Sequence, residues 1–103
     1  MTNILIVVWL HFIGDFVLQS DWVAINKSKR NDVLAMHVLI YAMPLLWFGW
    51  RFALLNAALH FLTDWPTSRA TSKLWQAGKR HWFFVVIGLD QAIHLTCLLV
   101  TLP

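Results

Sequence analysis

The chain has little of what a small water-soluble domain depends on. Only 13% of its 103 residues are charged, and its five acidic residues are all aspartates. A globular domain usually has about twice that charged share, most of it on the surface. The first apolar segment also lacks the basic start of a secretory signal. A single cysteine, Cys97, excludes an internal disulfide and a zinc site built from cysteines. With a mean hydropathy of +0.63, the composition favours an integral membrane protein.

Four apolar stretches predict an all-α, polytopic membrane protein, folded as a four-transmembrane-helix bundle in a single membrane domain. A hydrocarbon core of about 30 Å is crossed by about 20 helical residues. The predicted helices cover about residues 3–24, 33–49, 50–66 and 82–102, and residues 67–81 form an amphipathic cytoplasmic linker. The second and third helices are short for a span, so a homo-oligomer that shields them is one candidate state.

The basic residues predict how the chain is oriented. Seven of the eight fall in two linkers, after the first and third stretches: Lys27, Lys29, Arg30, Arg69, Lys73, Lys79 and Arg80. Only Arg51 lies in the turn between the second and third stretches. The positive-inside rule makes the linker side cytoplasmic and places both termini outside. We expect a multi-pass protein of the inner (plasma) membrane, with membrane lipids as partners and no nucleic acid.

The apolar stretches carry histidine and aspartate at helical spacing. The pairs are His11 with Asp15, His60 with Asp64, and, in reverse order, Asp90 with His94. Positions i and i+4 share one face of a helix. A charged side chain in mid-membrane costs at least about 2.5–3.5 kcal/mol, and no Lys or Arg is predicted beside these pairs. The compensating charge must then be a protonated histidine or a metal ion.

Imidazole and carboxylate groups are ligands for zinc, iron or manganese, and zinc is the first candidate. The predicted metal ligands, enough for one site or two, are His11, His37, His60, Asp64, Asp90 and His94. Asp15 or Asp21 is the predicted general base that activates water. Gln19, Asn56 and Gln91 are candidates for ordering the ligands or for binding substrate. A hydrogen-bonded polar core that only locks the helices, or a proton pathway, remains open.

The motif His-Phe-x-x-Asp-aromatic occurs at residues 11–16 and again at 60–65. Each copy lies in an odd-numbered predicted helix and is followed by a basic linker and a helix with a further histidine. This pattern predicts two parallel helical hairpin repeats.

The motifs together resemble a known family. They read His11-x-x-Gly14-Asp15-Phe16-x-Leu18-Gln19-x-Asp21-Trp22, Asn26-Lys27, His37, Asn56-x-x-x-His60-x-x-x-Asp64 and Asp90-Gln91-x-x-His94. They look like the domain of unknown function 3307 family of small bacterial and phage membrane proteins, whose name carries no activity. The resemblance implies a lysine soon after the third-helix motif, where Arg69 and Lys73 are the candidates. The His/Asp arrangement is similar, more loosely, to bacterial membrane-bound metal-dependent hydrolases.

Three functions fit this sequence. The first is a metal-dependent hydrolase acting on a lipid or lipid-linked ester, phosphoester or amide near the cytoplasmic leaflet. The second is a metal-ion or proton transporter or channel that uses the same residues as a relay. The third is a structural or partner-binding membrane protein whose polar core only holds the helices together.

Overall fold

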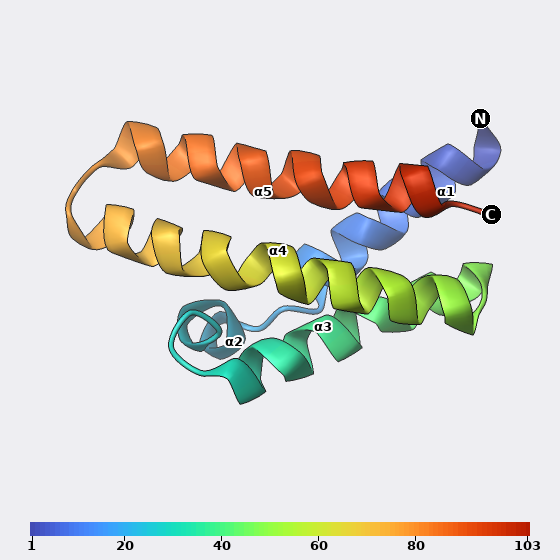
Figure 1. The fold of residues 1–103 in the computed structure, drawn as a ribbon, viewed down its shortest axis with the longest axis horizontal. Coiled ribbons are helices and arrows are strands. Elements are labelled where there is room, and N and C mark those ends of the chain that lie inside the picture. Colours follow the sequence, from blue (N-terminus) through green and yellow to red (C-terminus); the bar gives the residue numbers. More distant parts are fainter.

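The computed structural model describes residues 1–103 and confirms the all-α class. Its elements are α1 (Thr2–Phe12), the π-helical turn η1 (Ile13–Val17), α2 (Asp21–Asn26), α3 (Asn31–Leu45), the 3₁₀ turn η2 (Leu46–Phe48), α4 (Trp50–Gln76) and α5 (Arg80–Thr101). Four of the five α-helices pack in a ring, in which α1 contacts α3 and α5, and α4 contacts the same two helices (Figure 1). The short α2 packs against α3.

The chain ends and the turns lie at two opposite ends of the bundle. Figure 1 shows both termini and the α3–α4 turn at one end, with α2 and the α4–α5 turn at the other. The longest dimension is 41 Å. Two segments, Asn31–Phe48 and Arg80–Thr101, are long and apolar enough to cross a membrane. Core helices of soluble proteins meet the same criterion, so length and composition alone do not place the chain in a bilayer.

Polar side chains fill much of the interior, and large apolar ones cover the outside. The ten polar or charged residues among the 23 buried ones are His11, Asp15, His37, Asn56, His60, Asp64, Thr67, Ser68, Asp90 and His94. By contrast Trp9, Trp47 and Leu62 are each more than 60% exposed. In water-soluble proteins the charged residues are almost never fully buried unless paired, and large apolar patches are rare. The chain therefore has buried ionisable side chains and exposed large apolar ones, the reverse of the distribution in a water-soluble protein.

The sequence predicts that the third helix ends at Pro66, but in the structure this helix continues past the proline. α4 continues to Gln76, so most of the predicted surface linker is part of this helix. A proline inside a helix leaves a backbone carbonyl without its partner, and neighbouring side chains and helices can compensate. The single hydroxyl hydrogen of Thr67 is shared between the Thr63 carbonyl, 3.0 Å from Oγ1, and a carboxylate oxygen of Asp90 on α5, so it links the two helices just after the proline. The helix ends at Gln76, with Ala77 as its C-cap, and the positive-φ Gly78 (φ 73°) follows at the α4–α5 turn.

The first predicted helix is also interrupted. α1 ends at Phe12 and is followed by the π-helical turn η1, after which α2 starts again with Ser20 as its N-cap. The Ser20 hydroxyl accepts a hydrogen bond from the Val23 N–H at 3.3 Å, which is the usual capping interaction of serine at a helix N-terminus. Single π-helical turns are rare and often lie at functional sites. Here the turn carries the buried Asp15 toward α3 and α4.

Gly14 lies where η1 packs closely against the backbone of α3. A Cβ added at this residue would lie 2.8 Å from the Tyr41 carbonyl oxygen and 3.3 Å from the Tyr41 Cα. We expect Gly14→Ala to lower the free energy of unfolding by about 1–3 kcal/mol, because backbone must move to admit the methyl group. Gly88→Ala on α5 is the matched control, since nothing lies within 4 Å of its added Cβ. Thermal melting in detergent, followed by circular dichroism, measures both; equal melting temperatures would contradict the close approach.

Candidate metal centre

Three side chains from three different elements meet at the centre of the bundle. Asp15 comes from η1, His37 from α3 and His60 from α4, and all three are buried. The His37 Nε2 lies 3.1 Å from Asp15 Oδ1 and 3.2 Å from His60 Nε2, and the last separation, His60 Nε2 to Asp15 Oδ1, is 3.4 Å. Ligand atoms about 2.05 Å from a tetrahedral zinc ion are about 3.3 Å apart. The triad therefore has the spacing of one face of a metal tetrahedron.

Asp64 on α4 stands beside this triad. Its Oδ2 is 3.6 Å from the Nε2 atoms of both His37 and His60, and 2.9 Å from the Lys27 ammonium. The lysine corrects two expectations from the sequence. The buried carboxylates do have a cationic partner in the chain, and the lysine beside the site comes from the end of α2. The two expected candidates lie elsewhere: Arg69 bonds Asn31 on α3, and Lys73 is exposed.

Asp90 and His94 on α5 complete the cluster. The His94 Nε2 lies 3.1 Å from Asp90 Oδ1 and 3.8 Å from Asp64 Oδ1. Despite these distances the nitrogen is buried without an aligned hydrogen bond. Buried polar atoms are rarely left in this state. Asp15, Asp90 and His94 form one further group that could hold a metal ion, and His60, Asp64 and His94 form another; in each group the ligand atoms lie within 4.8 Å of one another.

The predicted ligand His11 belongs to none of these groups. Its Nε2 donates to Gln91 Oε1 at 2.7 Å, and its Nδ1 accepts from the Tyr41 hydroxyl at 2.9 Å. The amide of Gln91 in turn donates to Asp15 Oδ2 at 2.9 Å. Both nitrogens of His11 are therefore engaged in a chain that ends on Asp15. This series of hydrogen bonds holds Asp15 Oδ2 and leaves Oδ1 facing His37 and His60. Outer partners orient metal ligands in the same way.

The other predicted site residues lie at different distances from the cluster. Asp21 is exposed in the first turn of α2 and makes no ion pair with the cluster. Asn56 is buried, but its amide donates to the Phe52 carbonyl and to the Thr101 hydroxyl near the C-terminus, and not to any residue of the cluster. Gln19 has a buried amide oxygen without a hydrogen-bond partner. The spacing argument missed Lys27, whose only signal was its place in the Asn26-Lys27 motif.

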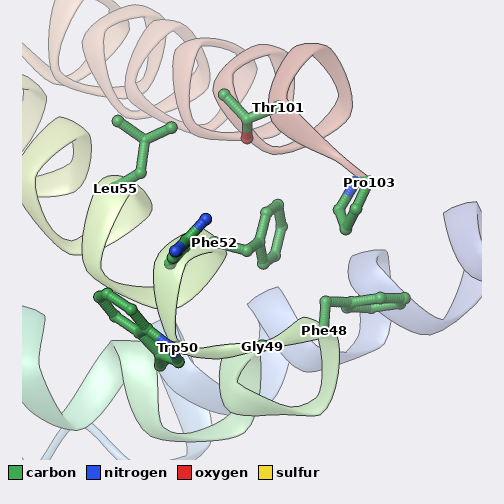
Figure 2. A pocket seen from close by; sticks show the side chains of 8 residues that line it. Phe48, Gly49, Trp50, Phe52, Leu55, Thr101 and Pro103 are labelled. Carbon is green, nitrogen blue, oxygen red and sulfur yellow. The ribbon is translucent and has the colours of Figure 1, made fainter.

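A polar cavity reaches the cluster from the end of the bundle that carries α2. It measures about 260 Å³ and is lined by Gln19, Ala24, Lys27, Asp64, Thr67, Ser68, Thr71, Phe83, Ile87 and Asp90. A larger cavity of about 440 Å³ lies at the α3–α4 turn, beside the C-terminus. Figure 2 shows mostly apolar side chains around it, including Phe48, Phe52 and Leu55. No histidine or aspartate lines that larger cavity, so the smaller one is the access to the cluster.

The fold and the cluster together define a small all-helical protein with a buried His/Asp centre that could hold a metal ion. The chain belongs to the family described as "Protein of unknown function (DUF3307)", whose profile matches residues 3–102. This confirms the family resemblance. No curated protein and no solved structure matches the chain, so no matched relative supports the looser similarity to membrane-bound hydrolases.

Proposed function

We propose that this protein is an integral membrane protein whose His/Asp cluster holds a divalent metal ion, zinc before iron or manganese, and hydrolyses a lipid or lipid-linked substrate. One observation carries the proposal. Asp15, His37 and His60 have tetrahedral ligand spacing and are buried, in a bundle whose outer surface is rich in large apolar side chains. A bound metal polarises an ester or phosphoester and makes water nucleophilic near neutral pH.

Several features support the membrane location. The 41 Å length of the bundle is close to that of a bilayer with its headgroups, about 40–45 Å. The exposed tryptophans and leucines would contact lipid, and the buried aspartates and histidines would be removed from it. The basic linkers lie at the α2 end and the termini at the other. In this proposal the α2 end is cytoplasmic and both termini are outside.

The polar cavity favours an enzyme over a core that only locks the helices. A purely structural cluster needs no opening, whereas Asp64 and Asp90 line a cavity at the basic end. The hydroxyls of Thr67, Ser68 and Thr71 provide its polar wall. A headgroup held at the cytoplasmic interface could enter there, attracted by the basic residues around it. Asp64 and Asp90 lie in both cluster and cavity and place carboxylates where a substrate would enter, whereas Asp21 is exposed and lines neither.

The opposite end of the bundle favours an enzyme over a transporter. Val7, Leu45 and Leu98 are completely buried there and belong to one apolar core with Phe52 and Ala53. A conducting path needs polar groups or water along its length, and this core interrupts it between the cluster and the termini. The cluster is thus open to one side only, as a site that binds and releases its substrate from one leaflet would be.

Hydrolysis by the purified protein tests the proposal. We expect metal-dependent cleavage of at least one lipid in a panel that contains phosphoester, carboxylic ester and amide bonds in its headgroups. His60→Ala should lower the rate by at least about 100-fold, because even loss of a ligand's outer partner costs 10–100-fold. His81→Ala, at an exposed position at the start of α5, should have no effect. Metal-loaded protein that moves ions across proteoliposomes but cleaves no lipid would contradict the proposal.

A further inference from the structure

We infer that the cluster is a binuclear centre, in which a second divalent ion lies beside the first and Asp64 bridges the two. This inference rests on the metal site of the proposed function. The first ion is assigned to Asp15, His37 and His60. The second is assigned to His94 and Asp90, whose ligand atoms are 3.1 Å apart. The buried His94 Nε2 has no aligned hydrogen bond, and a metal ion would give this nitrogen the partner that it lacks.

The orientation of the imidazole rings favours two ions over a single ion shared by all the histidines. A metal ion lies in the plane of each imidazole that binds it, because the nitrogen's electron pair lies in that plane. The rings of His60 and His94 are parallel within 9° and stacked, with centroids 3.8 Å apart. Planes so nearly parallel meet only far from the rings, so one ion could lie in the plane of His60 or of His94 but not close to both planes at once. The rings of His37 and His60 cross at 61°, which permits a common ion.

The stacking distance matches two ions better than one. Paired metal ions in hydrolases and phosphatases are about 3.5–4 Å apart, and the two stacked rings are separated by a similar distance. One ion in the plane of His60 and another in the plane of His94 would be at least the spacing of the two ring planes apart, which is compatible with a two-metal site.

Asp64 is placed to bridge these two positions. Its Oδ2 faces His37 and His60, at 3.6 Å from each Nε2, while its Oδ1 faces His94 at 3.8 Å. A carboxylate that presents one oxygen to each of two ligand groups can bind both ions at once. Asp15 also belongs to both groups, because it lies within ligand distance of Asp90 and His94 as well as of His37 and His60.

The charge of the cluster indicates the class of substrate. With neutral histidines, the three carboxylates and the Lys27 ammonium carry a net charge of 3 × (−1) + 1 = −2. One divalent ion neutralises this charge, and a second leaves +2 in a buried environment, where unbalanced charge is costly. A phosphodiester entering the cavity beside Lys27 would halve this charge, and a phosphomonoester dianion would balance it. In the headgroup panel above, the phosphoester is therefore the bond expected to be cleaved.

Manganese loading of the full chain tests the second ion. Purified protein is stripped with chelator, reloaded with Mn²⁺, freed of excess ion, and analysed by elemental analysis and electron paramagnetic resonance. Wild type should bind two equivalents and give the spectrum of an exchange-coupled pair. Asp90→Asn/His94→Ala should keep one equivalent and give the spectrum of an isolated ion. Thr96→Ala, at an exposed position of the same helix, should behave as wild type.

The outcomes separate the second ion from the proposed function. One equivalent in wild type, with no coupling, would overturn the binuclear centre and leave a mononuclear site. Folded wild-type protein that binds no metal would overturn the proposed function as well. Two uncoupled equivalents that persist in the Asp90→Asn/His94→Ala variant would place the second ion elsewhere on the chain and also overturn the inference. The wild-type result decides between one ion and two even if the double variant fails to fold.

Discussion

The His60→Ala/Asp64→Ala variant is expected to be purified without metal, whereas the wild-type protein carries zinc, iron or manganese. His60 provides one corner of the central triad, with its Nε2 3.2 Å from that of His37 and 3.4 Å from Asp15 Oδ1. Asp64 faces both that triad and His94. Its loss therefore removes one carboxylate oxygen beside the triad and another beside His94. The affinity should fall by well over about 100-fold, and elemental analysis of detergent-purified protein measures the retained ion.

Two comparisons make this result interpretable. The helix content of the variant, from circular dichroism, must match that of wild type, because His60 also packs against the Tyr41 ring and stacks on that of His94, and its removal leaves a cavity. His81→Ala removes a histidine outside the cluster and should leave the metal content unchanged. A variant that retains its metal would move the site away from α4. A well-folded, metal-free wild type would assign the pairs to proton chemistry or helix packing and end the hydrolase proposal.

The residues that the sequence could place are those whose neighbours are local. His60 with Asp64 and Asp90 with His94 share helix faces because both pairs lie in regular α-helices, where the i,i+4 rule applies. His37 has no such partner in its own helix and was included as a further histidine in an apolar stretch. It now lies at the centre of the cluster, in agreement with the cost of burying a polar side chain without partners.

The residues that the sequence could not place depend on irregular or long-range structure. The π-helical turn after Phe12 changes how Asp15 is presented, and His11 and Asp15 end 3.9 Å apart with different partners. Lys27 lies 37 positions from Asp64 in the chain, and nothing in the spacing shows which basic residue returns to the cluster. The sequence also predicts a helix end at Pro66, because proline disfavours a helix interior. In the structure α4 continues through this residue, and the Thr67 hydroxyl links it to Asp90 on α5 by a tertiary contact that spacing does not show.

Replacing Lys27 by methionine should destabilise the metal-free protein strongly and the metal-loaded protein much less. The lysine ammonium is 2.9 Å from Asp64 Oδ2, and the two side chains are 15% and 3% exposed. Removing one partner of a buried ion pair costs about 3–5 kcal/mol, because the other charge is left uncompensated. A bound divalent ion would compensate Asp64 in place of the lysine. Thermal melting in chelator and in excess zinc measures the two differences, and Lys29→Met, which removes an exposed cation two residues away, is the control.

The same substitution should tighten metal binding, and the two effects must agree in size. Lys27 and the metal ion share Asp64, so the lysine opposes the ion both by occupying the carboxylate and by charge repulsion. Lys27→Met lowers the free energy of unfolding by one amount in chelator and by a smaller amount in excess zinc. Thermodynamic linkage requires that the difference between these two amounts equals the gain in metal-binding free energy. Each 1.4 kcal/mol corresponds to about tenfold in the dissociation constant. Titration of wild type and Lys27→Met with zinc provides the second measurement. An equal loss of stability with and without metal, and an unchanged affinity, would mean that Lys27 contributes packing and that no metal ion binds at Asp64.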